Sequence, residues 1–224
     1  MATSQERLSE CWYKDVCQRD NPCNTCIKYI EMSHLMETSN LPKAKQRPIK
    51  LSVPSQDRDA YARLSEIKNN MYDFVYGGNN LYIAGSATGN GKTSWAIKLM
   101  HNFFDEIWDG NGLVQRGLFV HVPTFLAKCK DFNTKDPNFE LLKSQLMEVD
   151  LVIWDDIAST DMSAYDYSQL LPYIDHRLLS EYCNIYTGNY TDKDNLTKMV
   201  GERLASRIFT RNTEVVIFRS GDMR

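Results

Sequence analysis

The fold of this chain is decided by the stretch LYIAGSATGNGKTSWAIKLM, residues 81–100. It begins with a short apolar run, continues through a glycine-rich loop and ends in a helical pattern of apolar residues. In a phosphate-binding loop, glycines turn backbone N–H groups toward the phosphates, and the following helix N-terminus favours their negative charge. Strand, loop and helix in this order are the context that such a site needs. The stretch therefore predicts a nucleotide site.

Each polar side chain of the loop has an expected part in binding. Lys92 is expected to reach the β- and γ-phosphates, and the Thr93 hydroxyl to bind Mg²⁺. Five residues separate Gly85 from Gly91, one more than in the standard motif. Either Ser86 takes the first position or the loop carries one extra residue. The predicted nucleotide-contacting residues are Gly85, Thr88, Gly89, Asn90, Gly91, Lys92, Thr93 and Ser94.

Length and composition are those of a globular protein. The chain has 224 residues, 42% hydrophobic and 25% charged, which excludes wholesale disorder. Its net charge of -3 excludes a uniformly basic nucleic-acid-binding protein but leaves room for local basic patches. The N-terminus lacks the apolar core of a secretory signal, and no apolar run approaches the roughly 18 residues of a membrane span. We expect a cytoplasmic protein without a membrane partner.

Four of the six cysteines lie near the N-terminus with the spacing C-x5-C-x5-C-x2-C, namely Cys11, Cys17, Cys23 and Cys26. In a reducing compartment this cluster favours one tetrahedral zinc ion over disulfides. An iron–sulfur cluster and free or redox-active thiols are the alternatives. His34 is either a reserve ligand or a surface residue. Isolated Cys129 and Cys183 are expected to be small buried apolar residues.

The chain then divides into three expected parts: a metal-binding domain at 1–40, a linker at 41–56 and a larger domain at 57–224. A helix at 27–39 is expected to support the metal site through Ile27, Ile30, Leu35 and Met36. The linker contains three prolines and the basic residues Lys43, Lys45, Arg47 and Lys50, with no acid among them. We interpret it as an extended, basic segment that is either a solvated tether or a direct contact for nucleic acid.

The larger domain alternates strands and helices, which predicts an α/β fold with a parallel sheet and right-handed crossovers. Expected strands are 80–84, 117–122, 149–154, 184–187 and 214–218. Expected helices are 57–76, 94–108, 123–132, 138–148, 164–182 and two short ones within 192–209. Pro172 is expected to bend its helix, and Arg177 on the same helix is expected at the surface.

The third expected strand ends in Trp154-Asp155-Asp156-Ile157. The carboxyl end of this strand is expected beside the phosphate loop. Asp155 is then placed to hold Mg²⁺ through its water shell, and Asp156 to orient and polarise the attacking water. Two carboxylates at a strand end could instead cap the next loop. The second acid is aspartate where glutamate is usual in this fold, and its shorter reach favours slow hydrolysis.

With these motifs the chain resembles the AAA+ helicase loaders of the DnaC/DnaI type, most closely their phage-encoded members. The resemblance covers the linker helix, the phosphate loop, Asp155-Asp156, Thr187-Gly188-Asn189, Gly201–Arg207 and the chain end Phe218–Arg224. It implies an AAA+ (P-loop ASCE) domain with a five-stranded sheet, without a C-terminal helical lid. The cysteine-rich N-terminal segment fits the DnaI side of the family.

The resemblance also assigns roles to four polar residues. Asn189 matches the sensor-1 position, where an amide can bond the γ-phosphate and the attacking water. Arg207 matches the arginine finger offered to a neighbouring subunit, with Arg203 as a weaker candidate. Either could simply form a salt bridge. Arg224 matches the sensor-2 arginine by its distance from Arg207, unless the terminus is frayed.

The function implied is an Mg²⁺- and ATP-dependent loader of a hexameric replicative helicase onto single-stranded DNA, in a bacterium or a phage-infected host cell. Helicase would bind the N-terminal zinc domain, copies of the chain would assemble through ATP, and hydrolysis would be slow and partner-stimulated. Lys128 and Lys130 with Phe125 are candidate DNA contacts, or one face of a partly exposed amphipathic helix. An IstB-type transposition helper and an ATP-switched adaptor with little turnover are the alternatives.

Overall fold

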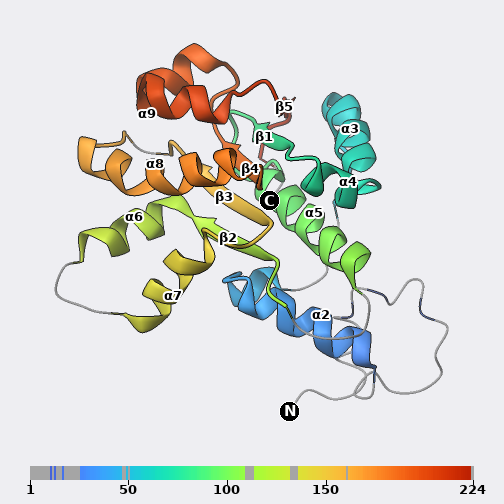
Figure 1. Cartoon of the computed structure of the whole chain (residues 1–224). Helices are drawn as coiled ribbons and strands as arrows, with labels where there is room; N and C mark the ends of the chain where they lie inside the picture. Colours follow the sequence, from blue (N-terminus) through green and yellow to red (C-terminus); the bar gives the residue numbers. More distant parts are fainter. Residues whose placement is uncertain are drawn as a thin grey trace.

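The fold is built on a parallel sheet of five strands in the order β2-β3-β4-β1-β5 (Figure 1). A computed structural model describes residues 11, 13, 17, 26–46, 49, 51–108, 114–131, 136–159 and 161–222. The strands are β1 (Asn80–Ala84), β2 (Gly117–His121), β3 (Leu151–Ile157), β4 (Cys183–Gly188) and β5 (Thr213–Ile217). The predicted five-stranded α/β sheet is confirmed.

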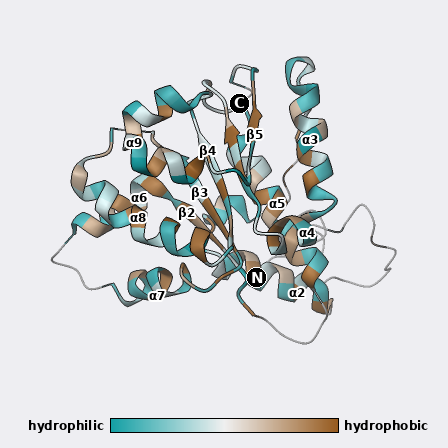
Figure 2. Ribbon diagram, turned by 45° about the horizontal axis from the view of Figure 1, so that its top comes forward, coloured by the Kyte–Doolittle hydropathy of each residue, from teal (hydrophilic) through white to brown (hydrophobic). Residues whose placement is uncertain are grey.

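Helices cover both faces of the sheet, and strand residues alternate between the two cores as the pleat requires. In β1, Leu81 and Ile83 join one buried cluster, while Tyr82 and Ala84 join the other. The first cluster packs under α2 (Ile27–Thr38), α3 (Arg58–Lys68), α4 (Met71–Tyr76) and α5 (Lys92–Ile107). The second packs under α6 (Val122–Lys130), α7 (Pro137–Gln145), α8 (Ala164–Leu179) and α9 (Lys193–Ile208). Figure 2 shows the hydrophobic strands between these layers.

One predicted helix has different boundaries in the structure, and the prediction of two short helices near the C-terminus is confirmed. The helix expected at 57–76 is divided into α3 and α4 at Asn69 and Asn70, whose backbone amides close the last turn of α3. Asparagine is a poor helix-interior residue because its side chain competes for nearby backbone groups, here Glu66 O. The two short helices expected at 192–209 are present, because Gly201 interrupts α9 with a left-handed φ of 76°.

Helix α2 buries only part of its expected apolar face. Leu35 and Met36 are buried as expected, together with Met32, and the helix packs beside α5. Ile27 and Ile30 are 62% and 49% exposed, and their support of a metal site stays a prediction. The sequence pattern missed this exposure because apolar residues lie on both faces of α2, and only the position of α5 selects one.

The first part of the expected linker is folded against edge strand β2. The amide of Phe119 donates to Ser39 O at 2.8 Å, and Asn40 Nδ2 donates to Phe119 O at 2.9 Å. Leu41 is buried, and the 3-10 turn η2 (Lys43–Lys45) follows. A second turn, η3 (Ser55–Asp57), leads into α3. Ser39 and Asn40 thus satisfy hydrogen-bonding groups of the sheet edge, and the first residues of the expected linker, 41–46, are folded rather than extended.

Arg177 is completely buried, so the prediction that it lies at the surface is wrong. Its guanidinium donates to Leu146 O, Val149 O, Asp150 O and Cys183 O at 2.7–3.1 Å, and Nε donates to Asn184 Oδ1 at 2.8 Å. Burial lowers its pKa to about 10, which leaves the side chain charged at neutral pH. Arg177 thus joins α8 to the starts of β3 and β4.

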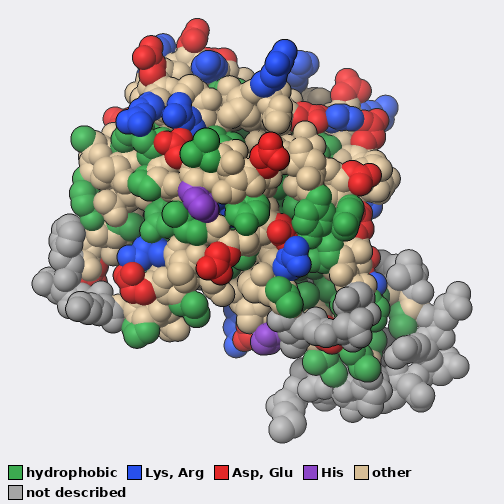
Figure 3. Space-filling model, in the orientation of Figure 1, with side chains coloured by type: hydrophobic (Ala, Val, Ile, Leu, Met, Phe, Trp, Pro, Cys, Tyr) green, Lys and Arg blue, Asp and Glu red, His purple; other side chains and the backbone are tan. Residues whose placement is uncertain are grey.

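Charged side chains of both signs are interspersed on the molecular face in Figure 3. None of the helices in the described part of the chain combines the length and the apolarity needed to cross a membrane.

The buried arginine makes a stability prediction. Arg177→Met removes the donors of five hydrogen bonds and leaves several buried carbonyls unsatisfied. We expect the free energy of unfolding to fall by about 3 kcal/mol or more, measured by denaturant titration. The matched control is Arg203→Met at an exposed position of α9, which should change it by less than about 0.5 kcal/mol. Equal losses in the two variants would contradict a structural role for Arg177.

Candidate nucleotide-binding site

The predicted phosphate loop joins β1 to α5 and borders a cavity of about 370 Å³ at the carboxyl ends of the strands. Most of the lining comes from the loop itself, with one acid from β3 and one residue after β4. The lining residues are Lys45, Thr88, Gly89, Asn90, Gly91, Lys92, Thr93, Ser94, Asp156 and Asn189. The structure therefore brings together most of the residues that the sequence assigned to the nucleotide.

Three glycines give the loop its shape. Gly89 and Gly91 have φ angles of 74° and 95°, the left-handed region that glycine adopts without strain. Gly85 has an ordinary φ, but a Cβ there would lie 2.5 Å from Asn90 Nδ2 and 3.0 Å from Phe218 O. Gly85 therefore lies at a close approach of two segments.

The ammonium group of Lys92 lies inside the loop. It donates to Gly85 O and Ala87 O at 2.8 Å and to Asn90 Oδ1 at 3.0 Å. Burial lowers its pKa, while the carboxylates of Asp156 and Asp155 oppose that shift. Asn90 Nδ2 is buried and has no partner among the described residues. A loop with a buried cation, an unused donor and an open helix N-terminus fits an anionic phosphate group.

Asp155 connects the loop to two strands. Its Oδ1 accepts hydrogen bonds from Thr93 Oγ1 and from Thr187 Oγ1, both at 2.7 Å, and Thr187 Oγ1 accepts from Asp156 N at 3.0 Å. Burial raises the pKa of Asp155, and the two threonine hydroxyls only partly offset the shift. A desolvated carboxylate beside a threonine hydroxyl fits a divalent cation, which would compensate the buried charge.

Asp156 differs from its neighbour in exposure and backbone. Its side chain is 41% exposed, it borders the cavity, and its φ of 58° turns the chain sharply after Asp155. This turn directs the two carboxylates differently, although they are adjacent in sequence. Asp155 faces Thr93, and Asp156 is open to solvent where an attacking water would enter.

Sequence reasoning did not assign three residues to this site, namely Thr187, His121 and Lys45. His121 ends β2 and lies opposite Asp155 in the strand register. Its Nε2 is 3.7 Å from Asp156 Oδ2, and its Nδ1 is 2.8 Å from Thr124 Oγ1. His121, Asp155 and Asp156 are, in the described part of the chain, the one group of three metal-type ligands within 4.8 Å of one another. Position at the end of a predicted strand was the available signal.

Two of the three predicted arginines, Arg207 and Arg203, lie outside the cavity lining. Arg207 is 36% exposed and pairs with Asp175 on α8, with Nε 2.6 Å from Oδ1. Arg203 is exposed and lines a separate hollow at the kink of α9. Arg224 lies outside the described residues. The roles of the three as finger and sensor stay predictions.

Helix α6 is the partly exposed amphipathic helix of the alternative, so Phe125 is not part of an exposed aromatic face, while DNA contacts by Lys128 and Lys130 stay a prediction. Phe125 is buried and packs against Phe139, with ring centroids 5.3 Å apart. Lys128 and Lys130 remain exposed but pair with Asp136 and Asp166, respectively. The sequence pattern could not show that Phe125 points toward the sheet.

The cysteine prediction is only partly within the described residues. Cys23 lies outside them, and Cys11, Cys17 and Cys26 form no three-ligand metal group of their own in the part that is described. The zinc site stays a prediction. His34 is exposed, as its surface alternative expected, and Cys183 is fully buried as predicted. Cys129 is only half-buried.

Comparison with solved structures shows which fold this is. No protein-family model and no curated protein matches the chain. A DnaC helicase loader aligns with TM-score 0.62 and 18% identity over 76% of this chain and 94% of that one. DnaI aligns with TM-score 0.59 and 18% identity over 81% and 92%. The replication initiator DnaA bound to AMPPCP and single-stranded DNA aligns with TM-score 0.56 and 19% identity over 74% and 48%.

These likenesses confirm the fold class expected from the sequence. The chain spans nearly the whole length of the DnaC and DnaI structures and about half of the DnaA structure. At identities below a quarter of the residues, the likeness extends to the fold alone.

The buried carboxyl of Asp155 makes a pH prediction. Because burial raises its folded-state pKa, the folded state is favoured most below the unfolded pKa of about 3.9, and stability is lost as pH rises through the folded pKa. Asp155→Asn keeps an Oδ1 acceptor for both threonines without the charge. We expect the nucleotide-free variant to melt above the wild type at about pH 8, and the gap to close toward about pH 4.

Thermal unfolding across this pH range checks the prediction. Asp156→Asn is the matched control, because its carboxyl is 41% exposed and its melting temperature should follow that of the wild type. Equal melting curves for wild type and Asp155→Asn at both ends of the range would show that the Asp155 carboxyl is hydrated in solution.

Proposed function

We propose that this chain is an Mg²⁺-dependent ATPase that loads a replicative helicase onto single-stranded DNA. The observation that carries the proposal is the convergence of Lys92, Thr93 and Asp156 at one cavity, with Asp155 hydrogen-bonded to Thr93 at 2.7 Å. This cavity occurs in a fold shared with a DnaC helicase loader and DnaI, and DnaA of the same fold binds an ATP analogue and single-stranded DNA. We further propose that the chain belongs with the phage-encoded members of the loader family.

The residues divide the chemistry between them. When bound, Mg²⁺ would neutralise charge on the β- and γ-phosphates, held by Thr93 and Asp155. Lys92 would exchange its present loop acceptors for phosphate oxygens, which keeps its hydrogen bonds satisfied. Asp156 would accept a hydrogen bond from the attacking water, and Asn189 would orient that water. The short reach of Asp156 favours a slow reaction that a partner accelerates.

Hydrolysis separates binding residues from the residue that activates water. Lys92→Ala should weaken ATP binding by about a hundredfold or more, because a buried cation at the phosphates is lost. Asp156→Asn should bind ATP like the wild type and lose about 10²–10³ in turnover, because an amide does not polarise water as a carboxylate does. Binding is measured by calorimetry and turnover by single-turnover hydrolysis with and without DNA and helicase.

The control for that pair is Asp73→Asn, an exposed residue of α4 that lies outside the cavity lining. Normal turnover in Asp156→Asn would move Asp156 to a structural role. ATP binding without turnover in the wild type, even with both partners, would favour the ATP-switched adaptor instead.

Assembly through ATP is the corresponding proposal for Arg207. Its partly exposed guanidinium pairs with one carboxylate, so a neighbouring subunit's phosphate could replace that partner. The same hydrolysis assay then includes a mixture of Lys92→Ala and Arg207→Ala proteins. Activity above that of either protein alone would place Arg207 across the interface. No recovery in demonstrably mixed oligomers would leave Arg207 with its intramolecular partner Asp175.

The N-terminal segment is proposed to hold zinc and to bind the helicase. Purified protein should contain about one zinc ion per chain, and Cys23→Ser should release it. The variant should also lose helicase-loading activity, measured as helicase-dependent strand displacement on circular single-stranded DNA, while ATP binding is retained. The control is Cys129→Ser, because Cys129 is half-exposed. Cys183→Ser is unsuitable, because Cys183 is buried in the core.

The outcomes distinguish the alternatives. Iron with acid-labile sulfide in place of zinc would favour an iron–sulfur cluster, and a metal-free but active protein would overturn the zinc proposal. ATPase stimulation by a transposase, with no effect on helicase loading, would favour the IstB-type helper.

A further inference from the structure

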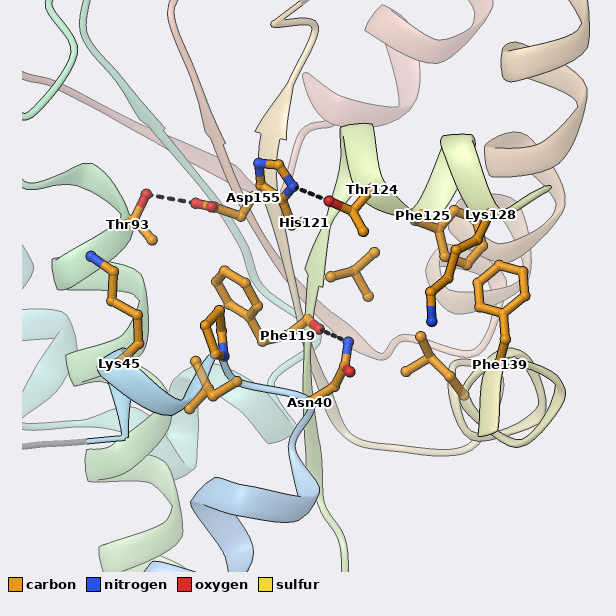
Figure 4. A pocket seen from close by; sticks show the side chains of 14 residues that line it. Asn40, Lys45, Thr93, Phe119, His121, Thr124, Phe125, Lys128, Phe139 and Asp155 are labelled. Atoms are coloured by element: carbon orange, nitrogen blue, oxygen red, sulfur yellow. Dashed lines mark hydrogen bonds between the residues drawn. The ribbon is translucent and has the colours of Figure 1, made fainter. Parts of the chain in front are cut away.

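One lysine of the N-terminal segment reaches the nucleotide cavity. Lys45 ends the short turn η2 and lines the cavity together with the phosphate loop, Asp156 and Asn189. It also lines a neighbouring, largely apolar cavity of about 530 Å³ that Thr93, His121 and Asp155 border. Figure 4 shows its ammonium group pointing toward Thr93, across from Asp155. No motif of the sequence placed Lys45 here.

The position of Lys45 is fixed by its own turn and by the sheet. Lys45 N donates to Pro42 O at 2.7 Å, and Gln46 Nε2 donates to Leu41 O at 2.9 Å. The residues just before the turn bond to Phe119 in β2. The chain is thus anchored to β2 just before the turn, which places Lys45 at the cavity.

The ammonium group of Lys45 has no hydrogen bond or ion pair within the described part of the chain. Other lysines near acids are paired there, as in Lys28 with Asp105 and Lys143 with Glu140. An unpaired, exposed cation at a phosphate cavity can bind an incoming anion at little desolvation cost. Lys92 already occupies the interior of the loop, so Lys45 adds a second cation from outside it.

The surrounding residues indicate which phosphate Lys45 would meet. It shares its two cavities with Thr93, Asp155, Asp156 and Asn189, the residues proposed to surround Mg²⁺ and the attacking water. These residues belong at the γ-phosphate, whereas the loop amides surround the inner phosphates. A lysine on this side would contact ATP and miss ADP.

We propose that Lys45 binds the γ-phosphate of ATP and thereby couples the N-terminal segment to the nucleotide state. The inference rests on the proposed ATP site and adds a contact to it. When ATP is bound, the turn at 43–46 is held at the cavity through a charge-assisted hydrogen bond. When the γ-phosphate leaves, the contact is lost. The turn follows directly after α2, so this change reaches the helix that carries the cysteine-rich segment.

The test compares the affinities of the full-length chain for a non-hydrolysable ATP analogue and for ADP, both with Mg²⁺. Lys45→Ala should weaken binding of the ATP analogue by about tenfold and of ADP by less than about twofold, because one charged hydrogen bond to the γ-phosphate is removed. Lys45→Arg should restore most of the preference. Lys43→Ala is the matched control, since Lys43 is exposed in the same turn but lines neither cavity.

Hydrogen exchange of the turn gives a second measurement. In the wild type and in Lys43→Ala, the ATP analogue should slow exchange of the amides at 43–46 more than ADP does, and Lys45→Ala should abolish the difference. Wild-type protein that binds neither nucleotide would refute the ATP site itself. Wild-type protein that binds both, with Lys45→Ala matching Lys43→Ala for each nucleotide and in hydrogen exchange, would overturn only the role of Lys45.

Discussion

A single buried carboxylate oxygen joins three segments at the carboxyl ends of the strands. Asp155 Oδ1 accepts from Thr93 at the start of α5 and from Thr187 in β4, so one atom joins the phosphate loop to two strands. Burial raises the pKa of that carboxyl, because a desolvated carboxylate is less stable than a hydrated one. A cation beside Asp155, as proposed above, would compensate this charge.

The amino-terminal ends of the strands, opposite the phosphate loop, are joined by a second buried polar network. Arg177 occupies the space where α8 meets the starts of β3 and β4 and bonds four backbone carbonyls together with the Asn184 amide. Asn184 in turn donates to Asn80 Oδ1 on β1 at 2.9 Å. Parallel strands leave unpaired carbonyls and amides at their ends, and this network satisfies them.

Segments from both ends of the described chain return to the central sheet near the phosphate loop. The buried carboxylate of Asp57 accepts from the amides of Arg219 and Ser220, and Phe218 N donates to Ala84 O beside the loop. At edge strand β2, on the opposite edge from β5, Ser39 and Asn40 just before the turn that carries Lys45 are bonded to Phe119. Elements that are distant in sequence therefore lie near the cavity at the carboxyl ends of the strands. Through these contacts, the proposed nucleotide would influence the position of each element.

The sequence alone determined the parts of this protein that depend on local pattern. Glycines with a following lysine and threonine specify the loop, apolar runs specify five strands, and Asp155-Asp156 at a strand end specifies the metal side of the cavity. Each signal lies within a few residues, and the right-handed crossover rule then brings the strand ends together.

Tertiary structure decided what depends on residues distant in sequence. Arg177 is a helix residue like any other until carbonyls from two segments surround it, and Phe125 and α2 acquire a buried face only from their neighbours. Thr187, His121 and Lys45 lie near the loop only because of the strand order β2-β3-β4-β1-β5. This order brings the carboxyl ends of β2 and β4, and the turn that carries Lys45, to the same end of the sheet. A one-dimensional pattern records periodicity and spacing, whereas the partner of a buried polar group is fixed only by the packing of the whole chain.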